Sequence, residues 1–175
     1  MGHMKIVVDH DKIEYNGPFD ANGLLRMISQ FMFERGFDFR QDKDFEINSS
    51  VGKSIEWQVS PWKRITDYIR YFFKIRVLIT DMVKIDITVG GKKRKVDKGK
   101  VTITMDAFME YDYESYWEDR PLLHFIRTIY DYFVFKPYSE KFEHVLVHDA
   151  NTLHDNIEKF LNMNRSYKVI SKTPP

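Results

Sequence analysis

Histidine residues are the first groups in this sequence whose type and spacing suggest chemistry. His144 and His148 lie four residues apart, so on a strand they would share a face, and His154 precedes Glu158 by four residues. Imidazoles and carboxylates are ordinary zinc ligands, which makes these groups the candidates for a metal site. The spacing matches no established motif, and His3 stands in a Met-Gly-His leader that looks like a cloning remnant. We therefore predict no bound metal and no other cofactor.

Other common catalytic sites find no support in the sequence. Residues 51–54 resemble the end of a phosphate-binding loop, but Ile47 stands where that motif needs a glycine. No Gly-X-Ser-X-Gly sequence occurs, and the absence of cysteine excludes thiol nucleophiles, disulfides and cysteine-ligated metals. A pair of catalytic carboxylates cannot be selected from 26 acidic residues without geometry. We favour a binding protein over an enzyme.

A run of basic residues is the clearest local charge feature. The whole chain has 27 basic and 26 acidic residues and a net charge of +1, so an electrostatic function must be local. We expect residues 92–100 to form a hairpin loop that contacts an anionic partner, either a nucleic acid or an acidic protein surface. The alternative is a solvated loop that keeps a long hairpin in solution. The six basic residues are Lys92, Lys93, Arg94, Lys95, Lys98 and Lys100.

A second group of basic and aromatic residues is expected on the polar face of the sheet. Arg70, Lys74 and Arg76 alternate with an apolar row, and Phe72 and Phe108 fall on the same face. Aromatic side chains on a sheet can stack on nucleic-acid bases, which extends the predicted anion-binding surface. Cross-strand ion pairs would explain the same mixture without a ligand, because four acidic residues are expected there too: Glu56, Asp86, Asp106 and Glu110.

Residues 110–119 are acidic and aromatic, nearly the charge complement of residues 92–100. Because one strand joins the two segments, we expect them at opposite ends of it. Such poles permit head-to-tail assembly, and Tyr113, Tyr116 and Trp117 form the expected interaction patch of a homo-oligomer. The alternative for the acids at 118 and 119 is stabilisation of a following helix N-terminus.

Two-residue alternation predicts three consecutive antiparallel strands between residues 66 and 111. Apolar residues hold the odd positions of 69–79, 83–89 and 101–109, whereas charged and polar residues hold most even positions. Asp81-Met82 is expected to connect the first two strands, and residues 92–100 to connect the second and third. The pattern is typical of a sheet with one covered and one wet face.

Helices and shorter strands complete the predicted fold. Helical spacing predicts one helix between Asp20 and Gly36, a second from Asp119 to just before Pro137, and a third beginning at Asp149. Residues 142–148 read as a short strand or an irregular crossover. Residues 5–8 with 12–15 predict a short hairpin or edge strand, and residues 54–59 predict a further strand.

These elements predict an α+β fold: a twisted antiparallel meander of about five or six strands, covered on one face by an N-terminal helix and two C-terminal helices. We expect residues 1–3 to be the cloning remnant, residues 4–165 a single domain, and residues 166–175 a frayed tail. A sheet that grips a long helix can also enclose a lipid or another apolar small molecule, the alternative function. No apolar run is long enough to cross a bilayer.

Two stretches resemble segments of small archaeal proteins that have no assigned function. They are SPWKRITDYIRYFFKIRVLITD at residues 60–81 and LLHFIRTIYDYF at residues 122–133. The resemblance extends over most of the chain from Phe19 onward and implies a cytoplasmic, thermophilic setting. It implies no activity and no site residues.

Overall fold

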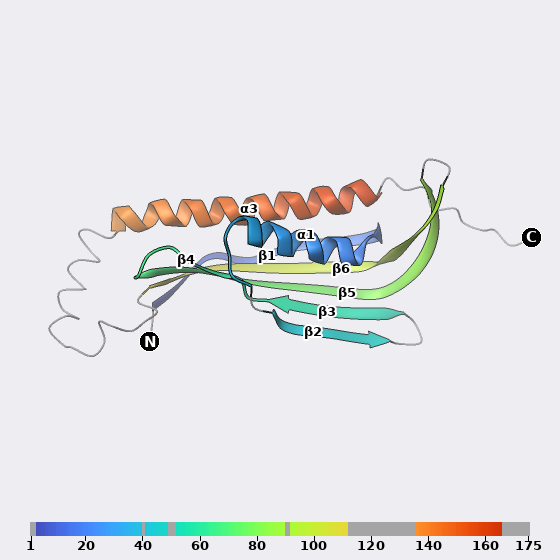
Figure 1. The fold of residues 1–175 in the computed structure, drawn as a ribbon, viewed down its shortest axis with the longest axis horizontal. Helices are drawn as coiled ribbons and strands as arrows, with labels where there is room; N and C mark the ends of the chain where they lie inside the picture. The colour runs from blue at the N-terminus through green and yellow to red at the C-terminus, as the bar shows by residue number, and fades with distance from the viewer. Residues whose placement is uncertain (1–2, 40, 49–51, 90–91, 112–135, 166–175) are drawn as a thin grey trace, which may run out of the picture.

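A curved antiparallel sheet carries two helices on one face in the computed structural model of the chain (Figure 1). The structure describes residues 3–39, 41–48, 52–89, 92–111 and 136–165. In chain order the elements are β1 (His3–Phe19), α1 (Ala21–Glu34), β2 (Gln41–Asn48), β3 (Lys53–Val59), β4 (Trp62–Arg64), β5 (Ile69–Val89), β6 (Lys92–Tyr111) and α3 (Lys136–Arg165). The predicted α+β class and antiparallel sheet are confirmed.

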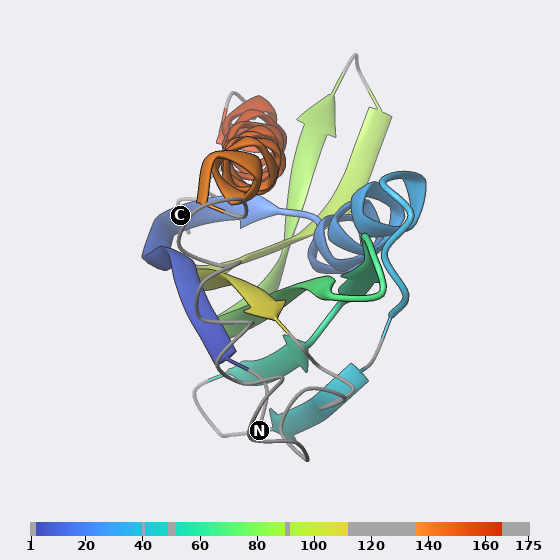
Figure 2. The same ribbon diagram turned by 90° about the vertical axis from the view of Figure 1, so that its left-hand side faces the viewer.

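The sheet is organised around the long hairpin formed by β5 and β6. These strands pair from Ile69↔Tyr111 to Val89↔Lys92. The strand order is β1-β6-β5-β3-β2, and the short β4 pairs with the first residues of β5. Figure 2 shows both helices on the same side of this sheet.

The core lies between the helices and the odd-numbered residues of the hairpin. Phe73, Ile75 and Val77 on β5 are 0% exposed, as is Ile157 on α3. The predicted apolar row of residues 69–79 is therefore the covered face of the sheet, as two-residue alternation requires.

Helix α1 begins and ends where its sequence indicates. Asp20 Oδ1 accepts a hydrogen bond from the backbone N–H of Gly23 at 3.0 Å, so it caps the helix N-terminus. Gly36 adopts φ +76°, a left-handed conformation that favours glycine and stops the helix. The first predicted helix is confirmed.

The C-terminal helix differs from the prediction. Helix α3 starts at Lys136, not at Asp149, and residues 142–148 are helical rather than a strand or a crossover. The β-branched pair Val145 and Val147 looked strand-like locally, but the buried residues recur at helical spacing: Leu146, Ala150, Leu153, Ile157 and Leu161. The described part of the chain contains two helices rather than three, because the expected helix after Asp119 lies almost entirely outside it.

The predicted connection at Asp81-Met82 is a β-bulge inside one continuous strand. The pairing register advances from Thr80↔Lys100 to Val83↔Lys98, so β5 contains one extra residue there. Asp81 takes φ +55°. A Cβ on Gly99 would lie 2.8 Å from the backbone oxygen of Thr80, so the bulge needs glycine opposite it.

The predicted loop at residues 92–100 is likewise wrong, because these residues belong to β6 and pair with β5. Beyond the bulge the hairpin turns toward the side of the sheet that carries the helices, at the right of Figure 1. We call residues 83–89 and 92–100 the basic arm, and the rest of the two strands the hairpin body.

The extra residue in the bulge moves the apolar row of β5 to the other face. Ile79 stands opposite the buried Val101, whereas Val83 stands opposite Lys98, whose side of β6 points away from the helices. Since directly opposite residues share a face, Val83 and Ile85 lie on the outer face. Accordingly, Val83 is 44% exposed.

β1 forms one edge of the sheet and is a single long strand rather than a short hairpin. It passes through Asn16, Gly17 and Pro18 without a break, and Pro18 pairs with Lys98 of β6. Proline is compatible with an edge strand because one side of that strand makes no ladder hydrogen bonds. Two register shifts between Ile6 and Asp11 mark bulges in the same strand.

Candidate functional site

The basic arm holds all six basic residues of the predicted loop, but on paired strands. Residues 97–100 of β6 pair with both β5 and β1, and residues 85–89 with 92–96 form a two-stranded ribbon. Residues 83–100 contain seven basic and two acidic side chains, a formal charge of +5, whereas the whole chain carries +1. Lys95, Lys98 and Lys100 are exposed. Lys92, Lys93 and Arg94 occupy the pairing positions opposite Val89, Thr88 and Ile87, respectively.

The strand register divides the arm's lysines between the two faces. Lys98 and Lys100 lie on the outer face, which continues along β6 to Thr104 and Asp106, the residues opposite Arg76 and Lys74. Lys95 lies on the other face, opposite Asp86. The structure thus brings Lys98 and Lys100 onto one surface with Lys74 and Arg76, which we call the outer cationic face.

Ion pairs neutralise part of the positive charge on the outer face of the sheet. The Arg70 Nε donates to Glu110 Oε2 at 2.9 Å, and Arg76 Nη2 lies 3.1 Å from Glu56 Oε1. The predicted cross-strand ion pairs are therefore confirmed for these two arginines. Lys74 stands opposite Asp106 and is exposed. The positive charge that remains for a partner is concentrated toward the arm.

An apolar row crosses the outer face next to these charges. Trp62, Phe72, Phe108 and Ile6 stand opposite one another in turn on β4, β5, β6 and β1. The rings of Phe72 and Phe108 lie 5.9 Å apart, and Arg70 lies over the indole of Trp62 at 5.7 Å. The predicted aromatic residues do share the basic face, but they are half-buried against their neighbours rather than fully open.

The three histidines proposed as metal candidates do not converge. His144 and His148 are exposed on one face of α3, beside a shallow depression of about 550 Å³ that also includes Arg35 and Asp149. His154 lies six residues farther along the helix and points to β1, where its Nδ1 is 2.8 Å from Asp11 Oδ2.

Burial by itself lowers the pKa of His154. The hydrogen bond and negative charge of Asp11, together with Glu158 and Asp155, outweigh that effect and raise the pKa above its ordinary value. His154 is thus a structural contact between α3 and β1.

A cluster that sequence reasoning missed lies at the second bulge of β1. His10 Nδ1 is 2.7 Å from Asp9 Oδ1 and 3.3 Å from Asp106 Oδ1, and the His10 backbone N–H donates to Asp106 at 2.7 Å. The hydrogen bond to Asp9 and the charges of Asp106 and Asp9 raise the pKa of His10. Asp106 is about a hundred residues from the other two in sequence, so only the strand register could have revealed the grouping. The bonds inside the cluster account for its arrangement without a metal.

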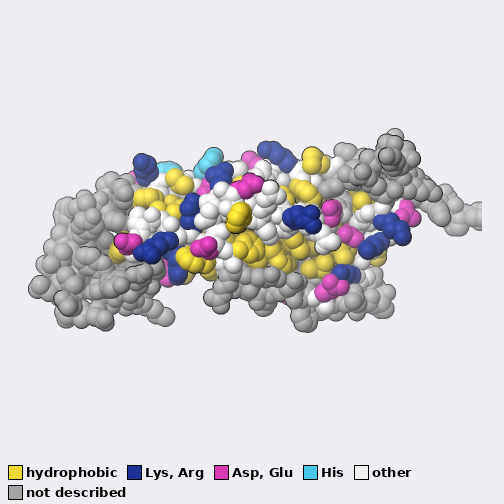
Figure 3. Space-filling view, in the orientation of Figure 1, with side chains coloured by type: hydrophobic (Ala, Val, Ile, Leu, Met, Phe, Trp, Pro, Cys, Tyr) yellow, Lys and Arg dark blue, Asp and Glu magenta, His cyan; other side chains and the backbone are white. Residues whose placement is uncertain are grey.

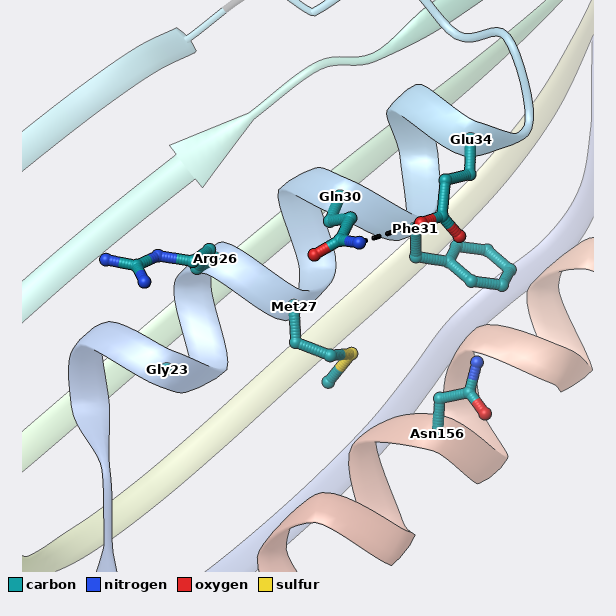
Figure 4. A pocket seen from close by; sticks show the side chains of 7 residues that line it. All are labelled: Gly23, Arg26, Met27, Gln30, Phe31, Glu34 and Asn156. Atoms are coloured by element: carbon teal, nitrogen blue, oxygen red, sulfur yellow. Dashed lines mark hydrogen bonds between the residues drawn. The ribbon is translucent and has the colours of Figure 1, made fainter.

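A groove of about 310 Å³ separates α1 from α3 (Figure 4). Met27 and Phe31 of α1 face Asn156 of α3 across it, and Gln30 Nε2 donates to Glu34 Oε1 at 2.8 Å along its upper side. Its lining mixes polar and apolar groups and is open to solvent. Small-molecule sites are usually concave and mostly apolar, so this groove is a poor match to one.

Buried side chains fill the space between the sheet and the helices, where an apolar pocket would have to lie. Phe73 and Ile75 of β5 and Leu153 of α3 are 0% exposed. A chamber large enough for a ligand would leave its lining accessible to a water molecule, and these side chains are not.

Charge is not segregated elsewhere on the side of the molecule seen in Figure 3. Basic and acidic side chains are interspersed there around apolar surface in the middle of the view. The predicted interaction patch at Tyr113, Tyr116 and Trp117 lies outside the described residues, as does the tail from residue 166.

Comparisons with known protein families, with curated proteins and with solved structures find no match to this chain. The resemblance to small archaeal proteins therefore stays a prediction. Within the residues that the structure describes, no helix combines the length and the apolar character that a membrane span requires.

Proposed function

We propose that the chain is a non-enzymatic binding module that contacts the phosphates of a nucleic acid through the basic arm and the outer cationic face. The observation that carries this proposal is the register that puts Lys98 and Lys100 on one surface with Lys74 and Arg76. Cations spaced along paired strands can follow a chain of phosphates.

The shape of the arm supports the same partner. Residues 85–89 and 92–96 of the arm form a two-stranded β-ribbon, and such a ribbon fits the major groove of B-DNA, which is about 12 Å wide. Exposed lysines act there as point charges that neutralise phosphates and release counterions. Because such contacts do not read base edges, binding should be largely independent of sequence. An acidic protein surface is the other anionic partner that this charge distribution favours.

Charge reversal with a matched control tests the proposal. We expect Lys98→Glu/Lys100→Glu to weaken binding to a labelled duplex. We also expect it to reduce the slope of log affinity against log salt by about 2. The control Lys141→Glu/Lys159→Glu reverses two exposed lysines on α3 and gives the same net charge. Equal losses in both variants, or no loss in the first, would show that the arm is not the site.

An apolar ligand between sheet and helices is the second function that the sequence suggested. The complete burial of Phe73, Ile75 and Leu153 speaks against it. Native mass spectrometry of freshly purified protein would reveal a co-purified lipid, and finding one would favour this alternative. Assembly through residues 110–119 remains a separate proposal, and screening by salt should weaken it.

A further inference from the structure

In the basic arm, the edge of β5 that faces away from β6 pairs with no described strand. β3 pairs with β5 from Val59↔Ile75 to Lys53↔Met82, and none of the described strands pairs with that edge beyond Met82. An edge of this kind presents backbone N–H and C=O groups that can accept another strand. Val83, Lys84 and Asp86 along it are exposed.

The sequence of this edge is complementary to itself. In an antiparallel pair of identical strands centred on Ile85, Lys84 of each chain stands opposite Asp86 of the other. The same two-fold arrangement places Ile85 opposite Ile85 of the second copy on the outer face. Opposite charges and like apolar groups are both stabilising as cross-strand neighbours.

Neighbouring registers lack this match. Centring the pair on Lys84 or on Asp86 sets two like charges directly opposite each other, which is destabilising. Centring it between two residues places Ile85 opposite a charged side chain and mixes the two faces. Of these registers, only the one centred on Ile85 sets opposite charges against each other on one face and apolar side chains on the other.

We propose that two copies of this chain pair through the β5 edges of their basic arms, in antiparallel register centred on Ile85, so that the two arms form one continuous antiparallel sheet. The pairing leaves Lys98 on β6, which becomes an outer strand of the two joined arms, and it does not depend on the function proposed above. A contact of this length buries less surface than a standard interface, so a dissociation constant of about 10 μM is expected.

A charge-swap experiment tests the register, with size-exclusion chromatography and light scattering at about 100 μM protein and no nucleic acid present. The wild-type chain should be dimeric. Lys84→Asp and Asp86→Lys should each weaken the dimer about a hundredfold, because both symmetric pairs become repulsive. An equimolar mixture of the two single variants should form a heterodimer, in which every facing pair again has opposite charges.

The mixture separates contacts between chains from effects within one chain. Lys84 stands opposite Asp97 and Asp86 opposite Lys95 inside the arm, so each single variant also opposes like charges there. Those internal changes persist in the mixture, so recovery of a dimer reports the contact between chains. The double variant Lys84→Asp/Asp86→Lys should dimerise for the same reason. A monomeric wild type, dimeric single variants or a monomeric mixture would each overturn the proposal.

Discussion

The hairpin body and the basic arm share two strands and one alternating pattern, yet the apolar row of β5 lies on opposite faces of the sheet in the two regions. In the body, Val77 lies under the helices and is 0% exposed. In the arm, Val83 lies on the outer face and is 44% exposed. One extra residue at the bulge between Thr80 and Val83 separates the two.

The difference shows that alternation fixes which residues share a face but not which face that is. The apolar row of the body is a core element, because helices cover it. The equivalent row of the arm has no described helix over it and lies beside lysines of β6, so it suits a contact with another molecule. A β-bulge changes the direction in which the side chains beyond it point.

The largest effect should come from shortening the same side chain on either side of the bulge. Val77→Ala removes fully buried methyl groups and leaves a cavity, so it should lower the free energy of unfolding by about 2–3 kcal/mol. Val83→Ala removes exposed groups and should change it by about 0.5 kcal/mol or less. Urea denaturation measures both. Similar losses in the two variants would mean that the apolar row is equally buried in body and arm.

Much of the body was predictable from the sequence. The odd-numbered apolar residues from 69 to 79 indicated the covered face, and Asp20 with Gly36 indicated the ends of α1. These signals are local, since they depend on two-residue or helical spacing and on cap chemistry. The acids expected at 56 and 110 pair with the arginines at 76 and 70, because alternation also fixes the polar face.

The arm was mispredicted because its glycines and charges are ambiguous in sequence. Gly99 and the charged residues around it are typical of a loop, but Gly99 provides the space in which the backbone of Thr80 approaches β6. That role depends on pairing with a bulge twenty residues away. The self-complementary edge around Ile85 also becomes meaningful only once β3 is seen to end its pairing at Met82.

Asp149 illustrates a second kind of ambiguity. An acid before an apolar helical repeat is typical of an N-cap, but this carboxylate lies inside α3, is 5% exposed and pairs with Arg35. A buried carboxylate inside a helix is tolerated when a cation from another element reaches it. The partner follows α1, more than a hundred residues earlier, so local spacing gave no sign of it.

A smaller effect should follow from disturbing the bulge itself. Gly99→Ala would place a Cβ 2.8 Å from the Thr80 oxygen, so the two strands must move apart locally. We expect a loss of about 1–2 kcal/mol in the free energy of unfolding, as for other overpacked sites. Asp81→Gly is the control, because glycine adopts the observed φ of +55° readily and should change stability by about 0.5 kcal/mol or less. An unchanged Gly99→Ala protein would show that the strands are not held this closely.

The smallest effect should be a pH dependence of stability at the contact between α3 and β1, which lies outside the arm. His154 ties α3 to β1 through Asp11, whereas residues 83–100 contain no histidine. Because the folded state raises the pKa of His154, the stabilisation is complete below the ordinary value of about 6.5 and is lost as pH rises through the raised pKa.

His154→Gln should therefore remove a pH-dependent part of the stability, worth less than about 1 kcal/mol between about pH 6 and pH 8. Urea midpoints across this range measure it, and His148→Gln, at an exposed position on the same helix, should retain the wild-type dependence. If His154→Gln keeps the full pH dependence, the contact between α3 and β1 does not depend on the imidazolium.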